Sequence, residues 1–466
     1  MVVTLFIFVL IFVLGFILTN TISTKLTLGE KVGLAFPFGF ALLSFVMVFY
    51  SFITVPFTLS LVLITSSVLA IISLAILWKQ GNLKRIIHFD TYPIQKLKSI
   101  NLSWIFLAGL VVYIVYAMAA KAMFWPTAAY DSITGYDYMA KVVAAEGTYN
   151  NSIFDVENPT AGIRHSYPPF VNSSFAVAYM AGLNSTKIIV VLLFISLAIY
   201  FWSVFRKYTT ETAAIFFTLL LVAVPEFLAM ASLSLTNVPQ TLFAAAGLIA
   251  IFEFIQKRDS SYLILGAVLV GLNVWTRSDG VIFIVGGGLM LLIDGFRNHR
   301  MKIANYWKPL VLFGAISATP FIIWQAYSKF YIKNVYSSSD AFVKHLFWDS
   351  DKFTDLVSQV YTILESTQLY GAIFIIFVIV IIANIRNIIK TKPIMLIGIL
   401  ISFALYFMLY YQMNNGGDGF AYSVQSMVRS SFKRGMFPFL PMVCFYMATT
   451  PMVNKFFNWI FKPIFK

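Results

Sequence analysis

The chain has little of what soluble proteins use for surfaces, crosslinks and metal sites. Only 11% of its 466 residues are charged, against roughly 25% in an ordinary soluble domain. Its single cysteine, Cys444, rules out a disulfide within the chain and leaves the redox compartment open. There is no Gly-rich phosphate loop, HExxH helix, cysteine pair or nucleophilic serine elbow. The four histidines are scattered, which disfavours a histidine-based metal site; they are His88, His165, His299 and His345.

Long apolar runs make up most of the chain. Hydrophobic residues are 60% of it, and the mean hydropathy is +0.84. Runs near the roughly 20 residues that cross a bilayer recur throughout, so we predict an all-α polytopic membrane protein with no sizeable soluble domain. We read the first run as a retained helix and not as a signal peptide. About thirteen crossings are expected, at 2–18, 32–52, 57–78, 104–124, 188–205, 213–231, 238–254, 262–275, 281–293, 309–324, 370–385, 394–411 and 436–448.

The positive charge is concentrated between these runs. Although the net charge of +14 could suggest a nucleic-acid partner, 19 of the 33 Lys and Arg residues lie in six short segments. By the positive-inside rule these segments are cytoplasmic, which places the N-terminus outside. The outer loops are then 125–187, 328–369 and 412–435, and 171–183 is expected to be an interfacial helix. The six basic segments are 79–103, 206–211, 256–260, 296–308, 386–392 and the tail after 453.

Two carboxylates follow directly after the apolar run 104–124, in the segment YDSITGYD at 130–137. Asp137 lies four residues before Lys141, which is typical of an ion pair on a helix surface. Asp131 has no such partner and begins the predicted helix after an aromatic cluster. It is either an N-cap or a catalytic base, and the two roles are compatible.

Basic residues in the outer part of the chain are candidate phosphate ligands. Arg164 and His165 precede a Pro-Pro pair, where the alternative is a turn with a snorkelling arginine. Arg277 and Asp279 separate two short apolar runs, 262–275 and 281–293, so we expect them in a dip reached from outside. Arg434 closes a basic cluster, with Arg429 and Lys433, on the side where positive charge is rare; the alternative is ordinary headgroup contact.

One pair of acids has spacing that suits a metal. Asp349 and Asp351 could hold a divalent cation through oxygen ligands, although two acids in a wet loop are more often solvated. A divalent cation is therefore possible, and no other cofactor is indicated.

The order of several weak motifs resembles the GT-C superfamily of membrane glycosyltransferases, of the protein mannosyltransferase and aminoarabinose transferase type. The motifs are YDSITGY at 130–136, HSYPP at 165–169, WTRSDG at 275–280 and the stretch from Arg434 to Pro441. The resemblance covers 104–466 as a catalytic transmembrane module and leaves 1–103 as three additional helices and a basic cytoplasmic loop. There are two departures: Asn237 stands where relatives often have Asp, and Asp279 where they have Glu.

The resemblance implies transfer of a sugar from a polyprenyl-phosphate donor to a glycan, lipid or protein acceptor. The reaction would be inverting and would occur at the outer face, which we expect to be that of the plasma membrane, with no nucleic-acid partner. Asp131 would be the base, and Asp137 and Asp279 are second acidic candidates. The candidates for the donor phosphate are Arg164, His165, Arg277 and Arg434.

Two alternatives remain from the sequence. A lipid-linked glycan polymerase or ligase would share the chemistry but use a lipid diphosphate donor. A transporter or lipid flippase would place polar sites near the midplane of discontinuous helices, often within internal repeats, and no repeat is visible here.

Overall fold

The computed structural model describes residues 2–23, 25–82, 102–154, 167–299, 303–331, 348–386, 393–413 and 423–460. Within these ranges the chain is helical and contains no β-strand, which confirms the predicted all-α class. The long apolar helices are α1 (Val2–Ile22), α2 (Leu28–Phe52), α3 (Leu59–Lys79), α6 (Leu102–Phe124), α9 (Lys187–Phe205), α12 (Asn237–Lys257), α14 (Val281–His299), α15 (Ile303–Tyr331) and α20 (Ile394–Gln412).

The described residues contain nine helices long and apolar enough to cross a membrane, or ten if a bent pair is one span. Three shorter apolar helices accompany them: α13 (Ser260–Thr276), α18 (Ile373–Ala383) and α23 (Phe439–Thr449). The chain is therefore a multi-pass membrane protein, while the predicted count of thirteen crossings is not confirmed.

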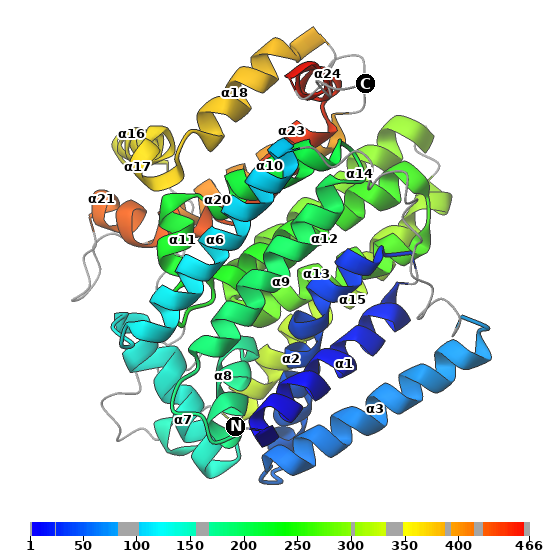
Figure 1. Ribbon diagram of the computed structural model, residues 1–466, viewed down its shortest axis with the longest axis vertical. Helices are drawn as coiled ribbons and strands as arrows, with labels where there is room; N and C mark the ends of the chain where they lie inside the picture. Colours follow the sequence, from blue (N-terminus) through cyan, green and yellow to red (C-terminus); the bar gives the residue numbers. More distant parts are fainter. Residues whose placement is uncertain are drawn as a thin grey trace.

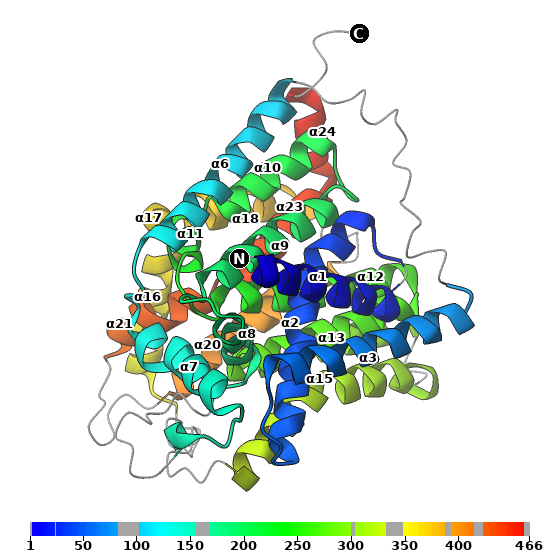
Figure 2. The ribbon, with the colours of Figure 1, turned by 60° about the horizontal axis from the view of Figure 1, so that its bottom comes forward.

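The helices form one bundle around α12 (Figure 1). α12 is almost completely buried and packs against α13, α14, α9 and α23. α3 and α6 lie on the outside of the bundle, as Figure 2 shows from a second direction, and most of their side chains are exposed to the surroundings. Their exposed apolar faces suit contact with lipid.

The bundle has two chemically different ends. At one end, which we call the Asp131 end, Thr4 at the start of α1 donates a hydrogen bond to the carbonyl of Ala181 (3.4 Å). Short elements gather here: η1 (Ser132–Tyr136), α7 (Asp137–Glu146), η2 (Ser152–Phe154), α8 (Phe170–Met180), η4 (Ser278–Gly280), α16 (Ser350–Glu365), α17 (Thr367–Tyr370), α21 (Val424–Met427), η6 (Val428–Phe432) and α22 (Lys433–Gly435). The other end, the Glu30 end, holds the start of α2 and α24 (Pro451–Ile460).

Three predictions about individual elements are wrong. The segment 171–183 is not an interfacial helix, because α8 is buried within the protein from Phe170 to Ala178 and packs against α7 and α2. The run 281–293 is not too short to span, because α14 continues through polar residues to His299. The apolar pattern stops at residue 293, so it did not predict the last turns of α14, which are polar.

The third correction concerns the predicted crossing 213–231. It is broken into α10 (Glu211–Val222) and α11 (Pro225–Ala231), which meet at an angle of 69°. Pro225 occupies the first turn of α11, where its missing N–H costs nothing and where it prevents α10 from continuing. The break brings Glu226 into the first turn of α11, at the Asp131 end.

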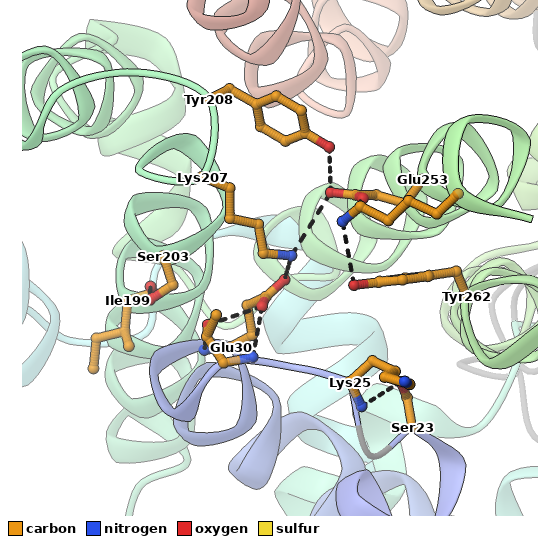
Figure 3. Close-up of polar contacts among 11 residues, drawn as sticks. Ser23, Lys25, Glu30, Ile199, Ser203, Lys207, Tyr208, Glu253 and Tyr262 are labelled. Atoms are coloured by element: carbon orange, nitrogen blue, oxygen red, sulfur yellow. Dashed lines mark hydrogen bonds and ion pairs between the residues drawn. The ribbon is translucent and has the colours of Figure 1, made fainter. Parts of the chain in front are cut away.

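A cluster of buried charges joins α2 to the rest of the bundle at the Glu30 end (Figure 3). Glu30 closes a capping box with Thr27 and also pairs with Lys207 Nζ (2.5 Å). Lys207 lies 3.7 Å from Glu253, which in turn receives a hydrogen bond from Tyr208. Both carboxylates are buried, so these contacts offset the cost of taking charges out of water.

Close backbone approach supports the same junction. A Cβ at Gly33 of α2 would lie 2.7 Å from Tyr200 of α9, and one at Gly39 would lie 2.2 Å from the Ile11 carbonyl of α1. Small residues at these contacts let apolar helices pack closely in a membrane. The N-terminal helices are thus packed on the module that the sequence resemblance covers.

Candidate active site

Asp131 and Arg434, which are 303 residues apart, form an ion pair at the Asp131 end. Arg434 Nη1 donates to Asp131 Oδ2 over 2.8 Å, and the two side chains are 22% and 30% exposed. Asp131 has helical backbone angles and makes no side-chain capping bond to η1. The N-cap interpretation is therefore wrong, and the carboxylate faces a cation next to a solvent-accessible space.

The guanidinium of Arg434 is held from its own helix as well. Its Nε donates to the Ser430 carbonyl (2.9 Å). The following residue, Gly435, fits directly against α20, because a Cβ there would lie 1.5 Å from the Tyr406 hydroxyl. Arg434 thus follows a π-helical turn, η6, and directly precedes the glycine that fits against α20. Such turns occur often at functional sites.

Arg277 and Asp279 form a second pair between α13 and α14. Arg277 Nε lies 3.2 Å from Asp279 Oδ2. Gln240 of α12 joins both, since its Nε2 donates to Asp279 Oδ1 (3.0 Å) and its Oε1 accepts from Arg277 Nη1 (3.4 Å). Burial opposes the charged form of Arg277, but the Asp279 carboxylate together with Tyr406, Tyr410 and Tyr136 outweighs it and raises the pKa. Arg277 is therefore a fixed, partly covered cation.

Tyr136 links the two pairs. Its hydroxyl lies near the side chain of Thr236, within the electrostatic reach of both Asp131 and Arg277. Burial raises the pKa of Tyr136 well above its usual value, so it remains a neutral hydroxyl. Its ring packs against Tyr167, with centroids 5.4 Å apart. The acids and cations predicted from separate motifs thus share one polar region.

Two tyrosines of α20 complete this region. Tyr406 and Tyr410 both interact electrostatically with Arg277. The Tyr406 hydroxyl donates to that of Tyr410 (3.1 Å), and the Tyr410 hydroxyl lies near the side chain of Ser431 in η6. α20 therefore connects the Arg277 pair to the turn that carries Arg434.

Asp137 belongs to a different environment. The predicted pair with Lys141 is present at 3.4 Å, but Asp137 is buried and not a surface residue. Its Oδ1 accepts hydrogen bonds from Tyr179 (2.6 Å) and Thr186 (2.9 Å). The carboxylate thus joins α7 to the end of α8 and to the residue before α9, which indicates a structural role.

The remaining predicted residues take no part in these two ion pairs within the described residues. Asp349 lies beside α20, where its backbone N–H donates to the Tyr411 hydroxyl (2.6 Å). Asp349 caps α16 by accepting from the backbone N–H groups of Asp351 and Lys352 (both 3.0 Å). Among the residues that the structure describes, no group of three or more His, Cys, Asp or Glu side chains could hold a metal. Arg164 and His165 lie outside the described residues.

Sequence reasoning missed Glu226. Its Oε1 lies 2.6 Å from Lys433 Nζ, and the two side chains are 12% and 21% exposed. The acid was hidden inside an apolar run interpreted as one crossing, yet Pro225 beside an acid in that run is a usable signal of a broken helix. Gln240 was missed because a single amide side chain in an apolar helix forms no recognisable sequence motif.

Comparison with known families supports the chemistry suggested by this region. Residues 170–324 match the dolichyl-phosphate-mannose-protein mannosyltransferase family. This third of the chain contains Glu226, Gln240, Arg277 and Asp279, and it confirms the predicted resemblance to membrane glycosyltransferases that use a lipid-linked sugar donor. Comparison with curated proteins and with solved structures gives no match.

Proposed function

We propose that this protein transfers a sugar from a polyprenyl-phosphate carrier to an acceptor at the outer face of the membrane. The observation that carries the proposal is the Asp131–Arg434 pair, which joins a carboxylate and a guanidinium beside the second cation, Arg277. Transfer from a sugar phosphate requires both kinds of group within reach of one substrate.

Arg434 would hold the phosphate of the donor. A guanidinium carries five N–H groups, and Arg434 uses Nε for Ser430 and one N–H of Nη1 for Asp131 within the described residues. Three N–H groups are left for phosphate oxygens, in the planar fork that phosphate binds well. The partly exposed position of this side chain suits a headgroup that arrives from the bilayer.

Asp131 would be the base. The acceptor hydroxyl gives its proton to the Asp131 carboxylate while its oxygen forms a bond to the anomeric carbon. The bond from that carbon to the phosphate oxygen breaks, and the phosphate leaves with the electron pair and is stabilised by Arg434. Attack opposite the leaving phosphate inverts the anomeric centre.

Arg277 would be the second cation for the donor, and Asp279 and Gln240 would hold its guanidinium in place. Asp279 is thus proposed to orient Arg277, because its carboxylate already engages two side chains. Arg164 and His165 remain proposed phosphate ligands from the sequence pattern. Asp137 is not included, since its carboxylate is engaged by Tyr179 and Thr186.

The topology is part of the proposal. Basic residues gather at the Glu30 end, where Lys207, Lys257 and Arg258 lie, and the positive-inside rule assigns that end to the cytoplasm. The Asp131 end is then outside, and we propose the plasma membrane. The acceptor would be a glycan, lipid or protein.

The test uses the purified protein in nanodiscs. Because the matched family is named for dolichyl-phosphate mannose, that lipid is the first donor, and binding of radiolabelled polyprenyl monophosphate is measured alongside. We expect saturable binding that Arg434→Ala weakens by about tenfold or more. Mass spectrometry of lipid that copurifies with the protein identifies the sugar. A requirement for a lipid diphosphate would favour a polymerase or ligase, and absence of binding to either lipid would reject the proposal.

A further inference from the structure

Glu226 occupies a position that an uninterrupted helix would not give it. The 69° bend between α10 and α11 turns the first turn of α11 back into the protein, and Glu226 lies in that turn. α11 packs against α17 and α6 (Figure 1). A mostly covered ionisable side chain at the end of a membrane bundle requires a partner and is a candidate for a functional role.

The partner of Glu226 is the residue next to Arg434. Glu226 Oε1 and Lys433 Nζ are 2.6 Å apart, and both side chains are mostly covered. Tyr370 of α17 donates its hydroxyl to the Lys433 carbonyl (2.5 Å), so Lys433 is held through its side chain and its backbone.

Consecutive residues of α22 therefore contact different parts of the protein. Lys433 binds α11 and α17, Arg434 binds Asp131, and Gly435 fits against Tyr406 of α20. α22 is the last part of a continuous helical segment, 424–435, whose π-helical turn η6 shifts the register of the side chains that follow it. These side-chain contacts decide where the Arg434 guanidinium lies.

We propose that Glu226 is a positioning residue for the donor phosphate site. It neutralises Lys433 and holds it on α11, which fixes α22 so that Arg434 meets both Asp131 and the phosphate. This inference rests on the proposed function of Arg434. Loss of the Glu226 charge leaves a covered, unpaired cation beside Arg434, and α22 then rotates to relieve it.

The experiment is a double-mutant cycle in which the measured quantity is the affinity for a polyprenyl lipid. Glu226→Gln, Lys433→Gln and the double variant are purified in nanodiscs, and the Kd for radiolabelled polyprenyl monophosphate is measured with the apparent Tm. Each single variant should raise the Kd about tenfold, because it leaves one charge unpaired. The double variant should return to within about threefold of the original protein, because two glutamines can hydrogen-bond without charge.

Asp294→Asn is the matched control. Asp294 makes a bidentate pair with Arg258 (2.5 and 2.9 Å) at the Glu30 end, far from the donor site along the bundle. Its substitution should lower the Tm and leave the Kd unchanged. If Glu226→Gln behaves like this control, or if the single effects add in the double variant, the positioning role is rejected.

Two further variants keep the outcome clear. If Glu226→Gln does not fold, Glu226→Asp retains the charge on a shorter side chain and should raise the Kd about threefold; an unchanged Kd rejects the inference. Arg434→Ala separates the two proposals. Weak binding by Arg434→Ala together with normal binding by Glu226→Gln rejects only the role of Glu226, whereas normal binding by both rejects the phosphate site itself.

Discussion

Exchange of Asp131 for asparagine tests the proposed base most directly. Asparagine keeps the shape of the side chain and an oxygen that can accept from Arg434, but it does not take a proton from an acceptor hydroxyl. If Asp131 is the base, we expect turnover to fall on the order of 10²–10⁴-fold. The same exchange at Asp137 changes a neighbouring carboxylate that we assign to structure.

The structure gives opposite expectations for stability at the two positions. The Asp131–Arg434 pair is 30% and 22% exposed, and such pairs contribute only about 0–1 kcal/mol. Asp137 is 6% exposed and accepts hydrogen bonds from Tyr179 and Thr186. Both donors bond to Oδ1, so asparagine keeps an acceptor for them, but that acceptor is no longer charged and an amide nitrogen replaces the Oδ2 that faces Lys141, which together cost about 1–3 kcal/mol. We therefore expect Asp137→Asn to lower stability and to leave turnover nearly unchanged.

The assay measures sugar transfer and apparent Tm on the same purified variants. Asp131→Asn should unfold near the temperature of the original protein and be inactive. Asp137→Asn should unfold earlier and retain turnover at temperatures where it is folded. An active Asp131→Asn enzyme beside an inactive, folded Asp137→Asn enzyme would reverse the assignment, and two active variants would refute a carboxylate base in this segment.

Three other predictions address the donor site, the buried charges and the topology. Arg434→Ala should weaken use of the lipid donor more than Arg434→Lys, because lysine keeps the positive charge and loses only the planar pair of N–H donors. Steady-state kinetics against donor concentration measure this difference. If both variants behave like the original protein, Arg434 is not part of the site. Glu30→Gln breaks the buried pair with Lys207 and should lower stability by about 3 kcal/mol without changing lipid binding, as thermal unfolding and binding assays would show; an unchanged Tm would contradict the interpretation. A cysteine introduced at position 157, in a Cys444→Ala background, should react with an impermeant thiol reagent from outside; labelling only after the inner face is opened would invert the topology.

The site was only partly predictable. Asp131, Arg277, Asp279 and Arg434 were each selected because a charge beside an apolar run is expensive and therefore informative. Glu226 was not selected, because its own apolar run hid it. The burial of Asp137 was also invisible, since spacing to Lys141 reveals a helical neighbour and nothing about Tyr179 and Thr186, which approach from a later part of the chain.

The sequence by itself determined the membrane class, the helical structure and the segments that carry charge. These follow from the bilayer, which requires about 20 apolar residues per crossing and an internal partner for every backbone group, so a linear pattern is sufficient. Only the tertiary structure decided that Asp131 faces Arg434 and that Glu226 meets Lys433. Those contacts join residues more than 200 positions apart, and their geometry depends on how helices pack against each other, which no local pattern encodes.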